Sequence, residues 1–195
     1  MPALDPIPPL PSVTVALGDL VPPLYQHYFS GFPDRPYYTL RRYDFPGHRG
    51  FLPLVRAFLD TCAAEHDTDY RYVFTLLGCE LASNSLVHSR SGRPGGTYAL
   101  VVRRGTGGLT LTCRDEGVIA PGRRGPAQDP RPLYAGALVM GDDGGATGAT
   151  GAEHGRGLAL VDALSTAWGD FGGQSYRHVW FHLAYDLADS AWGAA

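Results

Sequence analysis

The sequence predicts a protein of the α/β class, and three observations support this expectation. Two segments, residues 50–65 and 68–88, repeat apolar side chains at the spacing of a helix. Two others, 97–103 and 109–113, have the composition of strands and are joined by a glycine-rich turn, as in a hairpin. A further strand-like segment closes the chain. With 195 residues, the chain is long enough to bury the core of one domain.

The N-terminal third begins with a proline-rich stretch. Proline prevents a sustained helix and disfavours a central strand, so residues 1–35 are expected to form an extended arm. Residues 37–45 combine aromatic, leucine and arginine side chains in the manner of an edge strand, which Pro46 and Gly47 end. The helix that follows is expected to turn one apolar face to the core, made of Phe51, Leu52, Val55, Phe58, Leu59 and Cys62.

The C-terminal third contains a long connection, a helix and a strand. Residues 118–153 far exceed the ~4–6 residues of an ordinary connection, so they are expected to be a functional lid or a disordered insert. A helix opens at residues 155–157. Its apolar face is expected to consist of Leu158, Val161, Leu164 and Trp168. Residues 176–185 alternate as a final strand, and residues 186–195 are left as a C-terminal tail.

The helix over residues 68–88 carries a polar stripe on an otherwise apolar segment. Glu80, Asn84 and His88 recur at intervals of four residues, which places them on one face. Polar groups on a mostly buried helix cost free energy unless something satisfies them. A ligand, a metal ion or a set of internal hydrogen bonds is therefore expected to meet this stripe.

The charged residues exclude several functions. A net charge of −3 and scattered arginines leave no basic surface for a polyanion, so direct binding of nucleic acid is not expected. The chain contains no lysine. This absence excludes a Walker-type phosphate loop and Schiff-base catalysis, because both need a lysine side chain.

The cysteines and the hydropathy pattern indicate a cytoplasmic protein. Cys62, Cys79 and Cys113 lie in apolar stretches and form no C-x-x-C pair, so buried, reduced thiols are expected rather than a zinc site or disulfides. The chain starts without a basic, signal-like region, and no apolar run approaches the ~20 residues that a membrane span needs. No membrane partner is expected.

Three segments resemble, in order, the nucleotide-binding signature of Bergerat-type (HATPase) proteins, which include histidine kinases, gyrase-type topoisomerases and bacterial anti-sigma-factor serine kinases. Residues 80–89, ELASNSLVHS, are similar to the N box. Residues 115–117, DEG, are similar to the adenine box, and residues 153–161, EHGRGLALV, to the glycine-rich box. Taken singly, the first segment also fits a polar stripe satisfied by neighbouring backbone groups, the second an ordinary turn, and the third a flexible helix start. Their order favours the nucleotide site.

The resemblance covers residues 37–183 and is closest to the anti-sigma-factor kinases. It implies a Bergerat fold over residues 36–185: a two-layer α+β sandwich with a mixed, mainly antiparallel sheet, helices on one face, and an ATP lid over about 118–153. The chain departs from the family at His178, which stands where related proteins carry a threonine that helps to order the adenine pocket.

The resemblance also implies roles for single residues, with ATP and Mg²⁺ as the cofactors. Glu80 would be the general base toward a serine hydroxyl, and Asn84 would hold a Mg²⁺ ion that keeps most of its water. Asp115 would accept a hydrogen bond from the amine of adenine. Backbone N–H groups at the start of the last helix would meet the phosphates without a lysine. The other expected contacts of ATP are His88, Gly117, Gly155, Arg156, Gly157 and Leu158.

Three functional hypotheses follow from these expectations. The first is an ATP-dependent serine/threonine kinase that phosphorylates an anti-sigma-factor antagonist, sequesters a sigma factor, or does both. The second is a non-catalytic, nucleotide-gated module in which ATP orders the lid and creates a surface for a protein partner. The third, a detached histidine-kinase catalytic domain, is disfavoured because no helical hairpin with a phospho-acceptor histidine precedes the domain. A homodimer is left open.

Overall fold

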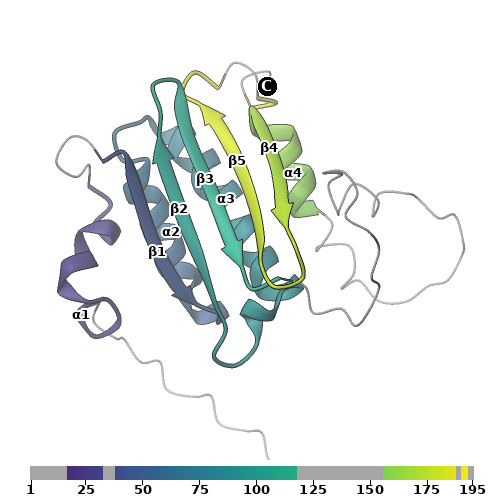
Figure 1. Ribbon diagram of the computed structural model, residues 1–195. Coiled ribbons are helices and arrows are strands. Elements are labelled where there is room, and N and C mark those ends of the chain that lie inside the picture. Colours follow the sequence, from purple (N-terminus) through teal and green to yellow (C-terminus); the bar gives the residue numbers. More distant parts are fainter. Residues whose placement is uncertain (1–16, 33–37, 118–155, 188–189, 193–195) are drawn as a thin grey trace, which may run out of the picture.

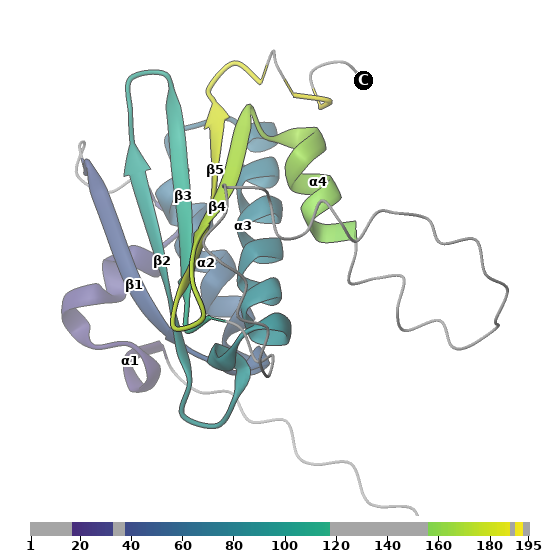
Figure 2. The ribbon, with the colours of Figure 1, turned by 45° about the vertical axis from the view of Figure 1, so that its right-hand side comes forward.

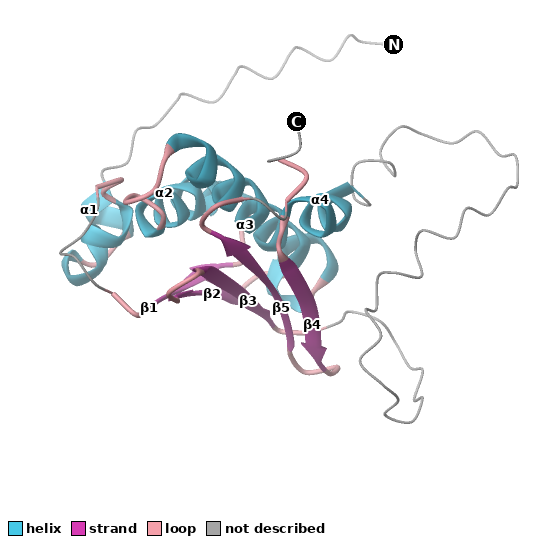
Figure 3. Cartoon of the chain, turned by 90° about the horizontal axis from the view of Figure 1, so that it is seen from above, coloured by secondary structure: helices cyan, strands magenta, loops and turns pink. Residues whose placement is uncertain are grey.

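The computed structural model describes residues 17–32, 38–117, 156–187 and 190–192, which fold as a two-layer α+β sandwich (Figure 1). One layer is a five-stranded sheet with the order β1-β2-β3-β5-β4. Its strands are β1 (Leu40–Pro46), β2 (Thr97–Arg104), β3 (Gly108–Asp115), β4 (Ala167–Gly172) and β5 (Arg177–Ala184). The other layer covers one face of the sheet (Figure 3). Its helices are α2 (Leu52–Cys62), α3 (Thr68–His88) and α4 (Arg156–Leu164).

The sheet is antiparallel throughout its described strands, which corrects the expectation of a mixed sheet. All four strand pairings run in opposite directions. β1 is an edge strand, as the sequence predicts, and β2 and β3 form the predicted hairpin with Leu100 opposite Cys113. The predicted helix over 68–88 coincides with α3, whose residues from Val73 onward are all buried or half-buried.

Trp168 lies in strand β4, which corrects its expected place on the apolar face of the last helix. α4 ends at Leu164, and Trp168 lies in β4 opposite Phe181. The Trp168 side chain packs against the core, and its indole Nε1 donates a hydrogen bond to Asp162 Oδ1 at 2.8 Å. Trp168 therefore has the sequence spacing of the apolar face of α4 but does not belong to that helix, because the chain reverses direction between α4 and β4.

The described part of the proline-rich arm is not extended. Residues Leu17–Leu20 form the short helix α1, and Pro23–Phe29 form a 3-10 helix that lies beside β1 (Figures 1 and 2). Proline suits the first position of such a helix, where its missing N–H has no partner in any case. Phe29 is buried, with ring centroids 5.0 Å from Tyr43 and 6.0 Å from Phe58. Part of the expected arm thus belongs to the core.

Two sets of contacts fix α3 on the sheet. Asp67 caps the start of the helix by accepting a hydrogen bond from the Tyr70 N–H at 2.9 Å. The buried Tyr70 hydroxyl donates to the Leu183 carbonyl at 2.8 Å and accepts from the Leu109 N–H at 3.1 Å. The two bonds of Tyr70 join the N-terminal part of α3 to β5 and β3.

His66 lies in the connection between α2 and α3 with its ring among aromatic side chains. The ring stacks on Tyr185 with centroids 4.3 Å apart and also contacts Tyr70. Its Nε2 is buried and has no hydrogen-bond partner in the part of the chain that the structure describes. Burial, followed by the charge of Arg104, lowers the pKa of His66 below its ordinary value of 6.5. The native state therefore favours the neutral ring.

We expect the free energy of unfolding to fall as the pH drops below about 6.5. His66 has a lower pKa in the native state than in the unfolded chain, so the unfolded chain binds the proton first. His66→Phe keeps an aromatic ring in the stack and removes this titration. The variant should therefore lose less stability than the wild type between about pH 7.5 and about pH 5.5. Urea unfolding at both pH values measures the difference, and equal losses would contradict the assignment.

Candidate functional site

Three segments that are far apart in the sequence meet around residues 80–85 of α3. On one side, Gly157 at the start of α4 packs against Glu80 and Asn84. A Cβ added to Gly157 would lie 2.5 Å from Glu80 Oε2 and 3.6 Å from Asn84 Nδ2. On the other side, Ser85 Oγ lies 3.5 Å from Asp115 Oδ2 at the end of β3. This part of α3 therefore links the acidic strand end to the start of α4.

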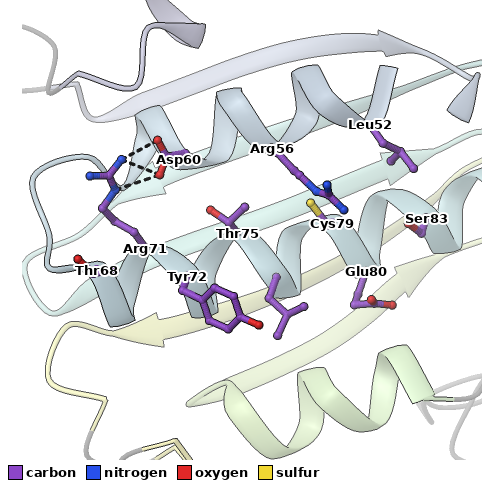
Figure 4. Close-up of a pocket in the computed structure, with 11 residues that line it drawn as sticks. Leu52, Arg56, Asp60, Thr68, Arg71, Tyr72, Thr75, Cys79, Glu80 and Ser83 are labelled. Carbon is purple, nitrogen blue, oxygen red and sulfur yellow. Dashed lines mark hydrogen bonds and ion pairs between the residues drawn. The ribbon is translucent and has the colours of Figure 1, made fainter. Parts of the chain in front are cut away.

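The polar stripe of α3 is present as the sequence predicts. Glu80, Asn84 and His88 are all half-buried. In Figure 4, the Glu80 side chain lies on the side of α3 that faces α4. His88 ends the helix, about two turns beyond Glu80, so the described contacts with Gly157 involve only the first two members of the stripe.

Glu80 also lines two grooves on the outer face of the helices. The larger, of about 670 Å³, runs between α2 and α3 and includes Arg56 and Ser83 (Figure 4). The smaller, of about 330 Å³, is lined by Arg49, Asn84 and again Ser83. Glu80 thus borders both grooves, which contain Arg56 and Arg49 respectively, and it also contacts the first turn of α4.

Asp115 ends β3 and forms a buried ion pair that the sequence alone did not indicate. Arg177 donates to Asp115 Oδ2 through Nη2 at 2.6 Å and through Nε at 3.0 Å. The Asp115 side chain is only 1% exposed, and the Arg177 side chain is 4% exposed. The β3–β5 register places Arg177 opposite Asp115 and His178 opposite Arg114. The residue that meets Asp115 is therefore Arg177, the neighbour of His178 in β5.

Gly117 follows Asp115 in a turn that requires glycine. Its φ of +75° lies in the left-handed region, and a Cβ there would collide with the Gln174 backbone. This conformation lets the Gly117 N–H donate to Asp115 Oδ1 at 2.9 Å. Arg90 fixes the same turn by donating to the carbonyls of Glu116 and Gln174, at 2.8 and 3.0 Å. A contact between Gly117 and a nucleotide remains a prediction.

The glycine-rich box is described only from its second half. Gly155 and the expected lid, residues 118–153, lie outside the described residues, as does the side chain of Arg156. Gly157 is buried in the first turn of α4, and Leu158 is half-buried and packs against the core. The box therefore starts a helix, as expected, and presents Gly157 to α3.

The three cysteines lie in the core or pack against it. All three are free of disulfides; Cys62 and Cys113 are buried, whereas Cys79 is half-buried and lines the groove between α2 and α3. Burial raises the pKa of the Cys62 and Cys113 thiols to about 12, so both stay protonated. Cys113 Sγ lies 3.1 Å from Ser85 Oγ, where it helps to fix α3 beside Asp115.

Glu80 and Asn84, the polar side chains of α3 beside Gly157, are the residues that could hold a cofactor or metal here. Mg²⁺ usually keeps several waters and takes its other ligands from one or two side chains and from phosphates. Asn84 can supply one amide oxygen. Across the described ranges, no group of three or more His, Cys, Asp or Glu side chains gathers as a metal site. Because Gly157 lacks a side chain, Glu80 and Asn84 lie close to the first turn of α4.

Comparison of the sequence with models of protein families finds no match, and comparison with curated proteins finds no matching relative. None of the described helices combines the length and apolar character needed to cross a membrane.

Proposed function

We propose that this chain is an ATP-binding regulatory protein of the Bergerat type that transfers phosphate to a serine or threonine of a protein partner. The observation that carries the proposal is the meeting of Gly157 with Glu80 and Asn84 on one side of α3, while Asp115 lies beside Ser85 of the same helix. Each of the three signature-like segments thus contributes a described residue to one region. The sandwich with helices on one face is compatible with such a site.

In this proposal, the nucleotide spans the C-terminal half of α3. Its base lies toward Asp115, and its phosphates lie toward the N-terminus of α4, where backbone N–H groups and the helix dipole favour anions. Asn84 holds Mg²⁺, which would neutralise charge on the phosphates. Arg49 and Arg56 line the two grooves that Glu80 borders, and they provide positive charge there in a chain without lysine.

Glu80 is the proposed general base. Its carboxylate accepts the proton of the partner's hydroxyl as that oxygen bonds to the γ-phosphorus, and ADP leaves with the electron pair of the broken bond. The groove between α2 and α3 gives a partner segment access to Glu80 from the outer face of the helices. The partner class, an anti-sigma-factor antagonist or a sigma factor, comes from the resemblance. The cytoplasmic location is the expectation from the cysteines and the hydropathy pattern, and a homodimer stays open.

One contact favours the alternative of a non-catalytic, nucleotide-gated module. Glu80 Oε2 lies directly against the position of Gly157, so the carboxylate could serve to hold α4 instead of accepting a proton. In that case, ATP binding alone would create the surface for a partner. Phosphoryl transfer separates the two functions.

The test is incubation of the purified chain with Mg²⁺, γ-labelled ATP and candidate antagonist proteins. We expect label on a serine or threonine of one of them. Nucleotide binding without transfer to any candidate would favour the module, and absence of nucleotide binding would contradict both functions.

Gly157→Ala should reduce phosphate transfer by about 10²-fold, because its Cβ would displace the Glu80 carboxylate and misplacement of about 1 Å can cost that much. The fold should persist, since alanine is a better helix former than glycine and the tip of Glu80 can move. Transfer rates and circular dichroism measure the two effects. Gly107→Ala is the matched control, because a Cβ there meets no atom within 4 Å. Equal rates for Gly157→Ala and wild type would contradict the placement of Glu80.

A further inference from the structure

The ion pair with Arg177 leaves the Asp115 carboxylate with little capacity to accept further hydrogen bonds. Each carboxylate oxygen offers about two acceptor positions. Arg177 fills both positions on Oδ2 with its Nε and Nη2 donors, at 3.0 and 2.6 Å. The Gly117 N–H fills one position on Oδ1 at 2.9 Å. Among the described residues, this leaves one acceptor position, and it is on Oδ1.

The arrangement is held in place from several sides. The antiparallel register of β3 and β5 sets Arg177 opposite Asp115, and Ser85 Oγ approaches Oδ2 from α3 at 3.5 Å. Both members of the pair are almost completely buried. A ligand that displaced the guanidinium from Oδ2 would leave a buried charge without its partner, which is strongly unfavourable. Oδ2 is therefore withheld from any ligand.

The two purine bases make different demands on a carboxylate. Guanine presents its N1–H and its exocyclic amine side by side, so it pairs best with both oxygens of one carboxylate. Adenine presents a single exocyclic amine and needs one acceptor. A carboxylate with one open position can satisfy adenine, but it leaves a donor of guanine unpaired, and sites reject ligands whose polar groups are buried without partners.

We propose that Arg177 is a specificity-determining residue, which selects adenine over guanine nucleotides by holding Oδ2 and leaving Asp115 only one acceptor position. Arg177 acts through Asp115 and is a positioning residue in this role. The inference depends on the ATP site proposed above and states what sets its base preference.

The test compares the dissociation constants of Mg-ATP and Mg-GTP for wild type and for Arg177→Gln. We expect the wild type to prefer ATP by about 10²-fold or more, and Arg177→Gln to reduce that preference at least tenfold, mainly by gaining affinity for GTP. If the role of Arg177 were purely structural, the substitution would weaken the binding of both nucleotides equally. The ratio of their dissociation constants would then stay unchanged. Arg114→Gln, at the exposed neighbour of Asp115, is the matched control and should not change the ratio.

Should Arg177→Gln not fold, Arg177→Lys serves as a second variant. It keeps the positive charge, but its ammonium group lacks the forked geometry with which the guanidinium fills both positions of Oδ2. Its preference for ATP should also fall. An unchanged ratio in a folded variant, or equal binding of both nucleotides by the wild type, would overturn the role of Arg177 and leave the ATP site standing. A wild type that binds neither nucleotide would overturn the proposed function itself.

Discussion

Glu80→Gln should slow phosphate transfer by about 10²- to 10⁴-fold while changing the affinity for Mg-ATP little. The substitution keeps the shape of the side chain and removes its ability to take a proton. Glu80 lies one turn from Asn84 and against the start of α4, so a loss of this size would place the base between the proposed metal ligand and the proposed phosphate site. The measurement is the transfer rate at saturating ATP, with nucleotide affinity determined in parallel.

Asp69→Asn provides the control for this experiment. Asp69 is exposed in the first turn of the same helix, far along α3 from the site, and its substitution should leave the transfer rate unchanged. Equal rates for Glu80→Gln and wild type would show that Glu80 is not the base. A loss of ATP affinity equal to the loss of rate would indicate that Glu80 holds α4 and the nucleotide in place, as in the alternative module.

Asp115→Asn should lower the free energy of unfolding by about 3–5 kcal/mol, because it removes the negative charge from a buried carboxylate that accepts two hydrogen bonds from Arg177. The side chains are only 1% and 4% exposed, so solvent cannot replace the lost carboxylate charge. Urea unfolding near neutral pH measures this loss. Nucleotide binding by the variant should be measured under conditions where it remains folded, since Asp115 has a structural role as well as the proposed one.

Asp44→Asn is the matched comparison on the surface. Asp44 pairs with Arg42 at 2.9 Å, but both side chains are at least half exposed, and such pairs contribute about 0–1 kcal/mol. If Asp44→Asn and Asp115→Asn lowered the free energy of unfolding by similar small amounts, the assigned contribution of the buried pair would be wrong.

The parts of this protein that follow from local patterns were predictable from the sequence. The stripe of Glu80, Asn84 and His88 depends only on the period of the helix, and α3 has the predicted bounds. The hairpin of β2 and β3 depends on a glycine-rich turn between two strand-like segments, and it also forms as predicted. In both cases, neighbouring residues determine the outcome.

The parts that depend on long-range register were not predictable. Arg177 meets Asp115 because of the alignment of β3 with β5, and a shift by one residue would have put His178 in its place. Trp168 fits the apolar spacing of α4 yet lies in β4, because an apolar residue after a helix satisfies either period. The contact of Gly157 with Glu80 requires the packing of α4 on α3, which neither segment specifies by itself.

In the proposed function, residues of α3, β3 and α4 form a site for Mg-ATP. Calorimetric titration of the chain with Mg-ATP at two temperatures tests it most directly, with Asn84→Ala and a metal-free titration as comparisons. We expect saturable binding by the wild type, and affinity at least tenfold weaker without Mg²⁺ and in the variant, because Asn84 is the proposed metal ligand. No heat from the wild type at either temperature, or equal affinity with and without Asn84 and Mg²⁺, would contradict the site.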